Sequence, residues 1–218
     1  MQLEEFLERT AARTPDKVAL ICKDRQLTYR EIDTEANQVA HGLIASGVQR
    51  GDRVVLFLDN SVEAAVGVWA VLKAGAVFVM ANPTTKPDKL TYLLNNSRAS
   101  CIIGQSSRLR GYETVWVETP HLRNVVVVGN VEDITDCTLP LAGWRELVDE
   151  NKENTLPPKK RCIDVDLAAL VYTSGSTGNP KGVMLTHANM VAANKSITSY
   201  LENTPDDVVL NVLPLSFD

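Results

Sequence analysis

The sequence predicts an α/β fold: a doubly wound, mostly parallel sheet with helices on both faces, preceded by a helix–hairpin–helix segment. Short apolar runs recur without polar alternation, and segments with helical spacing separate them. The predicted strands are residues 53–58, 76–80, 99–103, 124–129 and 167–172. Strands of this kind are buried on both faces, which is typical of parallel sheets covered by helices.

The N-terminal segment carries clear local signals. A short amphipathic pattern ends before Pro15, which predicts the first helix. The runs "KVALIC" and "RQLTY" flank a polar turn at 23–25 and predict a β-hairpin. Thr28, with Glu31 three residues later, predicts a capping box at the start of a second helix. Gly47 is the expected end of that helix.

Helix signals also lie between the predicted strands. Asn60 or Ser61 can cap a helix that continues to Lys73 and closes at Gly75. This helix is apolar almost all round, so we expect it to be buried. Shorter helices are expected at 87–95 and 144–150.

Two further elements are predicted near the C-terminus. A helix should run from about His187 to Leu201, and "DVVLNVL" (207–213) predicts a last strand. Helical spacing selects the inner face of that helix, which comprises Met190, Ala193, Ile197 and Tyr200 or Leu201.

Composition excludes several classes of protein. The net charge of −5 gives no reason to expect nucleic-acid binding. No apolar run approaches the roughly 18 residues of a membrane span, and the acidic N-terminus is not a secretory signal. The four cysteines are scattered without metal-ligand spacing. We therefore expect a cytoplasmic protein with reduced thiols and no metal-ligand cluster.

The domain organisation is expected to be one continuous unit, residues 1–218. A polar stretch with a Pro-Pro pair, residues 151–161, predicts an exposed linker within it. The chain stops directly after the apolar run "VVLNVLPLSFD". Domains more often end on a polar tail or surface helix, so we expect the N-terminal fragment of a longer protein.

The stretch "YTSGSTGNPKG" (172–182) has the composition of an anion-binding loop. Its glycines allow close backbone approach and positive φ, and successive N–H groups can form a nest for phosphate oxygens. We expect it to follow a buried strand and precede a helix, at the carboxyl edge where ligands bind. Lys181 supplies one positive charge; a triphosphate needs more, so Mg²⁺ is implied. The hydroxyl donors are Thr173, Ser174, Ser176 and Thr177, and the glycines are Gly175, Gly178 and Gly182.

The loop matches neither common phosphate motif. A P-loop requires Gly before the lysine and Ser or Thr after it, but Lys181 stands between Pro180 and Gly182. The dinucleotide pattern G-x-G-x-x-G is also absent. A surface loop without any ligand is the alternative interpretation.

A longer match then narrows the interpretation. "YTSGSTGNPKGVMLTHANMV" resembles the signature of the AMP-forming adenylating superfamily, which includes acyl-CoA synthetases, luciferase and adenylation domains of nonribosomal peptide synthetases. Residues 27–83 are similar to the opening region of that family, and "LPLSFD" (213–218) resembles the start of its acyl-binding part. The resemblance covers essentially the whole chain. It implies that the remainder of the large domain and the C-terminal domain are absent.

The resemblance implies a two-step reaction. A carboxylic acid attacks the α-phosphate of ATP, pyrophosphate leaves, and a thiol of coenzyme A or of a phosphopantetheinyl carrier protein takes the acyl group. Lys181 and Thr177 would be catalytic, since donors aimed at the developing phosphate charge lower the barrier. By the same resemblance Thr173, Ser174, Gly175, Ser176, Thr177, Gly178 and Lys181 would hold ATP.

The acid itself is poorly specified. The resemblance implies that Phe217 and Asp218 begin the substrate pocket. In amino-acid-activating members this aspartate pairs with the substrate ammonium, whereas in some fatty-acyl members it has another role. His187 could lie near that pocket, or it could be a first-turn residue behind a Thr186 cap. The runs "MLTHANMVAANKSI" and "NPTTKPDKLTYLLNNS" resemble the acyl-CoA or acyl-AMP ligase branch of the family more than the amino-acid adenylation domains, which are the second candidate.

A third class also stays open, namely a non-catalytic nucleotide-binding module. The family's acidic Mg²⁺ ligand and its C-terminal catalytic lysine fall in later motifs. We therefore expect residues 1–218 to fold, to bind ATP weakly at most and not to turn over.

Overall fold

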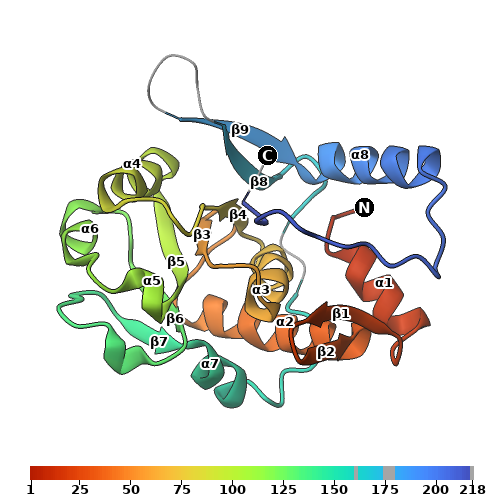
Figure 1. The fold of residues 1–218 in the computed structure, drawn as a ribbon, viewed down its shortest axis with the longest axis horizontal. Helices are drawn as coiled ribbons and strands as arrows, with labels where there is room; N and C mark the ends of the chain where they lie inside the picture. The colour runs from red at the N-terminus through yellow and green to blue at the C-terminus, as the bar shows by residue number, and fades with distance from the viewer. Residues whose placement is uncertain (160–161, 174–179, 217–218) are drawn as a thin grey trace.

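The computed structural model of the 218-residue chain describes residues 1–159, 162–173 and 180–216 (Figure 1). It begins with α1 (Glu5–Arg13), the antiparallel pair β1 (Val18–Cys22) and β2 (Arg25–Thr28), and α2 (Tyr29–Ala45). The predicted helix–hairpin–helix segment is therefore confirmed.

The predicted capping box of α2 is also confirmed. The Thr28 hydroxyl accepts a hydrogen bond from the Glu31 N–H at 3.2 Å, and the Glu31 carboxylate accepts one from the Thr28 N–H at 2.7 Å. That backbone donor holds the pKa of Glu31 below its usual value. The helix start is thus set by two residues three positions apart.

A seven-stranded sheet follows, with the order β7-β6-β5-β3-β4-β8-β9. All neighbouring pairs are parallel except β8 and β9, which are antiparallel. The doubly wound α/β prediction is confirmed, although β7 and β9 were not predicted. The strands are β3 (Arg53–Phe57), β4 (Val77–Met80), β5 (Ala99–Gln105), β6 (Asn124–Val128), β7 (Leu141–Gly143), β8 (Leu167–Thr173) and β9 (Lys181–Thr186).

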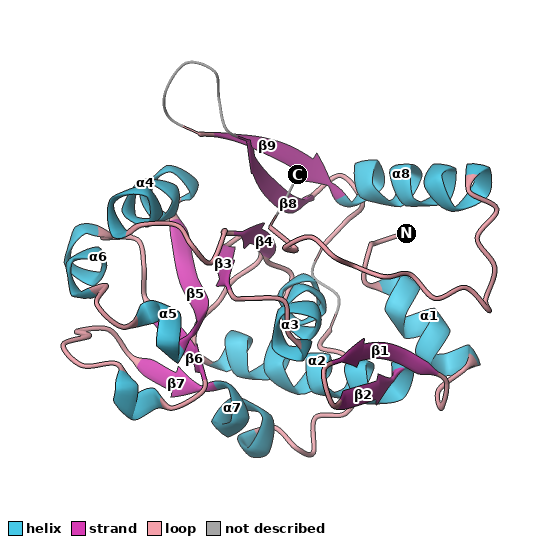
Figure 2. Ribbon diagram, viewed as in Figure 1, coloured by secondary structure: helices cyan, strands magenta, loops and turns pink. Residues whose placement is uncertain are grey.

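Helices lie on both faces of the sheet (Figure 2), and one core forms on each face. On β3, Val54 and Leu56 enter the first core, while Val55 and Phe57 enter the second. Both faces of this strand are buried, which is why its sequence shows no polar alternation. The first core is covered by α2, α3 (Val62–Lys73) and α7 (Trp144–Glu150). The second is covered by α4 (Pro87–Ser97), α5 (Ser106–Leu109) and α6 (Glu113–Glu118), with a 3₁₀ turn at Val131–Asp133 beside it.

The helix α3 is buried as its composition predicts, and its last residue brings a charge inside. The Lys73 side chain has no exposed surface. Its Nζ lies 2.9 Å from a carboxylate oxygen of Asp33 on α2 and 3.3 Å from one of Glu8 on α1. One ammonium group therefore joins the first three helices.

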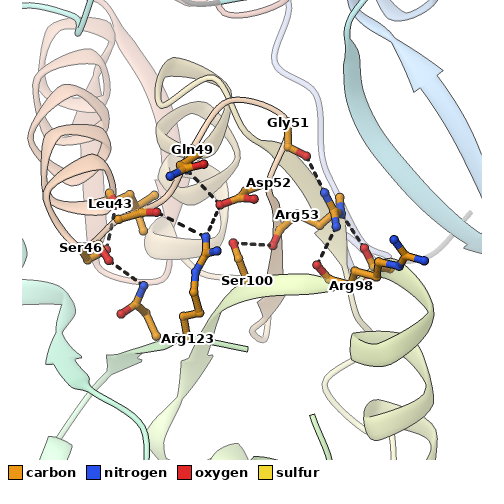
Figure 3. A network of polar contacts seen from close by, with 12 residues as sticks. Leu43, Ser46, Gln49, Gly51, Asp52, Arg53, Arg98, Ser100 and Arg123 are labelled. Carbon is orange, nitrogen blue, oxygen red and sulfur yellow. Dashed lines mark hydrogen bonds and ion pairs between the residues drawn. The ribbon is translucent and has the colours of Figure 1, made fainter. Parts of the chain in front are cut away.

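Two arginines at the amino-terminal edge of the sheet bind the ends of helices (Figure 3). Arg53 donates to the carbonyls of Ser97 and Arg98, at the end of α4. Arg123 contacts the Gly47 carbonyl, just beyond α2, and pairs with Asp52 at 2.5 Å. Cations stabilise the carbonyl-rich end of a helix, so these contacts tie α2 and α4 to the sheet.

The polar stretch 151–161 is bound to α2 as far as the structure describes it. Asn37 Nδ2 donates to the Thr155 carbonyl at 2.7 Å, and Gln38 Nε2 donates to the Lys152 carbonyl at 3.1 Å. His41 Nε2 lies 3.1 Å from the Leu156 carbonyl. Lys160 and Arg161 lie outside the described residues.

Two predictions near the C-terminus are wrong. Residues 207–213 do not form a strand, because no strand of the described chain pairs with them. The last helix, α8 (His187–Tyr200), buries only His187 and Val191. Apolar spacing shows which residues could be buried, but α8 contacts the body mainly through its first turn (Figure 1). Of the expected inner face, Met190 is half-buried, whereas Ala193, Ile197, Tyr200 and Leu201 are exposed.

No helix in the described ranges combines the length and apolar character needed to cross a lipid bilayer. The four cysteines are free. Burial raises the pKa of the Cys101 thiol to about 12, and that of Cys162 to about 11. Neither of these two thiols is a reactive thiolate near neutral pH.

The Lys73→Met variant should lower the free energy of unfolding by about 3 kcal/mol, because it removes the buried cation that Glu8 and Asp33 contact. Equilibrium denaturation measures the loss. Lys195→Met, at an exposed position on α8, is the control and should change stability by less than about 0.5 kcal/mol. Equal losses in the two variants would contradict a structural role for the buried ammonium group.

Candidate functional site

The candidate site lies at the carboxyl-terminal edge of the parallel strands. After β3 the chain passes to α3 and the first core; after β4, the neighbouring strand, it passes to α4 and the second core. Adjacent strands whose connections diverge leave a crevice between them at this edge, where α/β proteins bind ligands. β8 is parallel to β4 and ends at the same edge.

The glycine- and hydroxyl-rich loop begins at this edge. Thr173 is the last residue of β8 and faces Lys181, the first residue of β9. The two ends of the loop are therefore paired across a hairpin. The predicted ligand residues Ser174, Gly175, Ser176, Thr177 and Gly178 lie outside the described residues.

The expected strand–loop–helix arrangement is wrong in one respect. The loop leads into β9, which pairs antiparallel with β8, and α8 begins only at His187. The β-branched and apolar residues of "KGVMLT" suit a strand, and pairing with β8 makes this part of the motif β9. The start of α8 agrees with the prediction.

Tyrosine side chains dock the base of this hairpin on α4. The Tyr172 hydroxyl donates to Asn96 Oδ1 at 2.7 Å, and the Tyr92 hydroxyl donates to the Pro180 carbonyl at 3.2 Å. Burial raises the pKa of Tyr172 above its usual value. The Tyr172 hydroxyl therefore stays protonated, and able to donate, throughout the neutral range.

The Tyr172 ring lies against Gly182 on the paired strand. A Cβ added at Gly182 would lie 3.2 Å from Cζ of that ring, closer than an ordinary van der Waals contact. The glycine therefore leaves room for the tyrosine that reaches α4. Its role here is steric, in addition to any flexibility it gives the loop.

Lys181 is the charged group at the mouth of the loop. Its side chain is exposed. Among the described residues it forms no ion pair. An exposed ammonium group beside a loop of backbone donors can attract an anion without first breaking an internal pair.

His187 lies in the interior of the fold. It has no exposed surface, and its Nδ1 accepts a hydrogen bond from the Leu3 N–H at 3.1 Å, with a Glu4 carboxylate oxygen 3.5 Å away. Thr186 caps α8, with Asn189 completing a capping box, as the first-turn alternative predicts. His187 joins the N-terminal segment to α8, and its assignment to a substrate pocket stays a prediction.

Phe217 and Asp218, the other predicted pocket residues, lie outside the described residues. The backbone that leads to them is described as far as Ser216. Leu213 and Leu215 are hydrogen-bonded to Asn60, which follows β3. The backbone at 213–215 thus lies at the carboxyl edge of the sheet, the edge at which β8 ends.

Several polar residues at this edge were not predicted. Arg108 makes two hydrogen bonds, of 3.1 and 3.0 Å, to the Asp59 carboxylate after β3. The Tyr112 hydroxyl donates to the Thr85 carbonyl after β4. The sequence signal that could have identified this edge is the presence of polar residues directly after apolar strands. In the described chain, no three His, Cys, Asp or Glu side chains converge as a metal site.

A separate hollow of about 560 Å³ lies between β2, α2 and α7, and its lining includes Arg30 and Glu35. Figure 1 places these elements at the other end of the molecule from the β8–β9 hairpin. This hollow is therefore remote from Thr173 and Lys181, the described ends of the loop.

Comparison with known proteins identifies the family. The profile of the AMP-binding enzymes matches residues 7–218. The chain belongs to the family of AMP-binding enzymes. It is 34% identical over 216 residues to bacitracin synthase 1 of Bacillus licheniformis, a match that covers 99% of this chain and 4% of that protein.

A second relative of this AMP-binding chain is a medium/long-chain-fatty-acid–CoA/3-oxocholest-4-en-26-oate–CoA ligase of Mycobacterium tuberculosis (strain CDC 1551 / Oshkosh). It is 33% identical over 190 residues, which is 87% of this chain and 34% of the ligase. The chain therefore spans only part of the length of these curated relatives.

Solved structures share the fold of this AMP-binding chain. The apo structure of MbtA from Mycobacterium smegmatis has a TM-score of 0.86 and 29% identity, over 99% of this chain and 39% of that one. An anthranilate CoA ligase, AuaEII, solved with anthranoyl-AMP, has a TM-score of 0.79 and 28% identity, over 92% of this chain and 36% of its own.

The Gly182→Val variant should lower the free energy of unfolding by about 2 kcal/mol, because its side chain would displace the Tyr172 ring. Denaturant titration measures the change. In a Tyr172→Ala background the same substitution should cost less than about 0.5 kcal/mol, since the ring is gone. Additive losses in this double-mutant cycle would show that the ring does not set the requirement for glycine.

Proposed function

We propose that the protein uses ATP to activate a carboxylic acid. A carboxylate oxygen attacks the α-phosphorus, the bond to the bridging oxygen breaks, and pyrophosphate leaves with the electron pair. The acyl-adenylate then reacts with a thiolate, which forms a thioester and releases AMP. The placement of the loop between β8 and β9 carries this proposal, because both its ends are held at the edge where the strand connections diverge.

The loop is assigned to the phosphates. Thr173 and Lys181 stand at its two ends, so its backbone and hydroxyl groups would surround an anion that Lys181 neutralises. Lys181 and Thr177 act on the charge that develops as pyrophosphate leaves. The other ligands of ATP are assigned to Ser174, Gly175, Ser176 and Gly178, on the resemblance alone.

ATP is used together with Mg²⁺, which neutralises phosphate charge and makes pyrophosphate a better leaving group. The described residues contain no cluster of three His, Cys, Asp or Glu side chains that could hold a metal ion.

The thiol acceptor is coenzyme A or a phosphopantetheinyl carrier protein. We favour the acyl-CoA or acyl-AMP ligase class because the runs "MLTHANMVAANKSI" and "NPTTKPDKLTYLLNNS" resemble that branch. The similarity to a fatty-acid–CoA ligase supports this choice. Amino-acid activation is the second candidate, and the similarity to bacitracin synthase 1 supports that one. Asp218 would then pair with the substrate ammonium.

ATP–pyrophosphate exchange with fatty, aryl and amino acids tests the proposal in the full-length protein. Exchange should depend on one class of acid, and Lys181→Ala should lower its rate about 100-fold by removing the charge at the phosphates. Thr177→Ala should lower it about tenfold. Lys195→Ala, exposed on α8, should leave it unchanged. Absence of exchange with every acid would refute the ligase function and favour a nucleotide-binding module.

Residues 1–218 alone should give no exchange and only weak ATP binding, because the chain spans only 34% of the related CoA ligase. Calorimetric titration of ATP with and without Mg²⁺ checks this expectation. Tight binding that is independent of Mg²⁺ would contradict it.

A further inference from the structure

One asparagine side chain brackets the backbone that leads to the predicted acid pocket. Asn60 Nδ2 donates to the Leu213 carbonyl at 2.8 Å, and Asn60 Oδ1 accepts from the Leu215 N–H at 2.8 Å. The two bonded groups flank Pro214. Figure 1 shows this blue C-terminal segment returning across the molecule toward the start of α3.

The two hydrogen bonds of Asn60 have the pattern that a neighbouring parallel strand would make. In a parallel ladder a residue donates to the carbonyl before the opposite residue and accepts from the N–H after it. The Asn60 amide makes the same two bonds around Pro214, which has no N–H of its own. A single side chain therefore takes the place of a pairing strand at this position.

The preceding residues show why such a bracket matters. Val208 and Leu210 are 89% and 82% exposed, and residues 207–213 lie outside any sheet. A segment with so few contacts samples many conformations unless a specific bond stops it. The Asn60 bonds give it a fixed point at Leu213 and Leu215, two residues before Phe217 in the sequence.

Asn60 is itself held firmly. The next residue, Ser61, caps α3 by accepting a hydrogen bond from the Ala64 N–H at 3.1 Å. The preceding residue, Asp59, is bonded twice to Arg108. The bracket is thus anchored to the rigid connection between β3 and α3.

We propose that Asn60 is a positioning residue for the carboxylic acid. By fixing residues 213–215 at the carboxyl end of β3, it sets the position of the backbone that leads to the predicted acid residues relative to Thr173 and Lys181, the described ends of the loop. It does not touch the reacting atoms. This inference rests on the proposed function, and it assigns to the turn after β3 a role in binding the acid.

The first test measures KM for the acid and KM for ATP separately, by ATP–pyrophosphate exchange in the full-length protein. Asn60→Ala should raise KM for the acid about tenfold, with KM for ATP within about twofold. Asn60→Asp keeps the acceptor for the Leu215 N–H and loses the donor to Leu213, so its effect should be intermediate. The control is Asn124→Ala, which removes a bond to the Ser46 carbonyl at the opposite edge and should change neither KM. Equal rises in both KM values for Asn60→Ala would overturn the proposal.

The second test reads the bracket directly, without turnover. Hydrogen exchange of the Leu215 amide should be at least about tenfold faster in Asn60→Ala and near normal in Asn60→Asp. If the hydrogen-exchange rate of the Leu215 amide is unchanged in Asn60→Ala, the proposed role of Asn60 is refuted, even if the enzyme is active. If the unmodified protein shows no ATP–pyrophosphate exchange, the proposed function is refuted instead. The rate of hydrogen exchange at the Leu215 amide would still show whether Asn60 holds the backbone, so the two failures are distinguishable.

Discussion

Neighbouring parallel strands β3 and β4 send their connections to opposite faces of the sheet, and the candidate site depends on that divergence. The register pairs Arg53 with Val77, so both strands end at the same edge. The connections bury Val54 and Leu56 in one core, and Val55 and Phe57 in the other. The connections therefore diverge at this edge, which is the arrangement at which α/β proteins bind ligands.

Polar contacts hold the elements that form this edge. Lys73 joins α1, α2 and α3 by buried ion pairs, and Arg53, at the opposite end of β3, binds the end of α4. Tyr92 and Tyr172 dock the base of the β8–β9 hairpin on α4. These contacts hold the two described ends of the loop, Thr173 and Lys181, at the carboxyl edge of the sheet.

Local signals predicted the elements whose causes are local. Thr28 and Glu31 form their capping box within four residues, and the continuous apolar run of β3 identifies a strand buried on both faces. Non-local causes were missed. β9 exists because it pairs with β8, and residues 207–213 are not a strand because no described strand pairs with them. The predicted inner face of α8 is wrong for the same reason, since helical spacing does not specify which element packs against a helix.

The sequence by itself determined the fold class, the position of the glycine- and hydroxyl-rich loop between Thr173 and Lys181, and the adenylating family, because these depend on residue order and spacing. The tertiary structure decided which distant residues meet: Lys73 with Glu8 and Asp33, Tyr172 with Asn96, His187 with Leu3, and Asn60 with Leu213 and Leu215. Such contacts join side chains far apart in the chain. Their partners are set by how the helices and strands pack, which a local pattern does not encode.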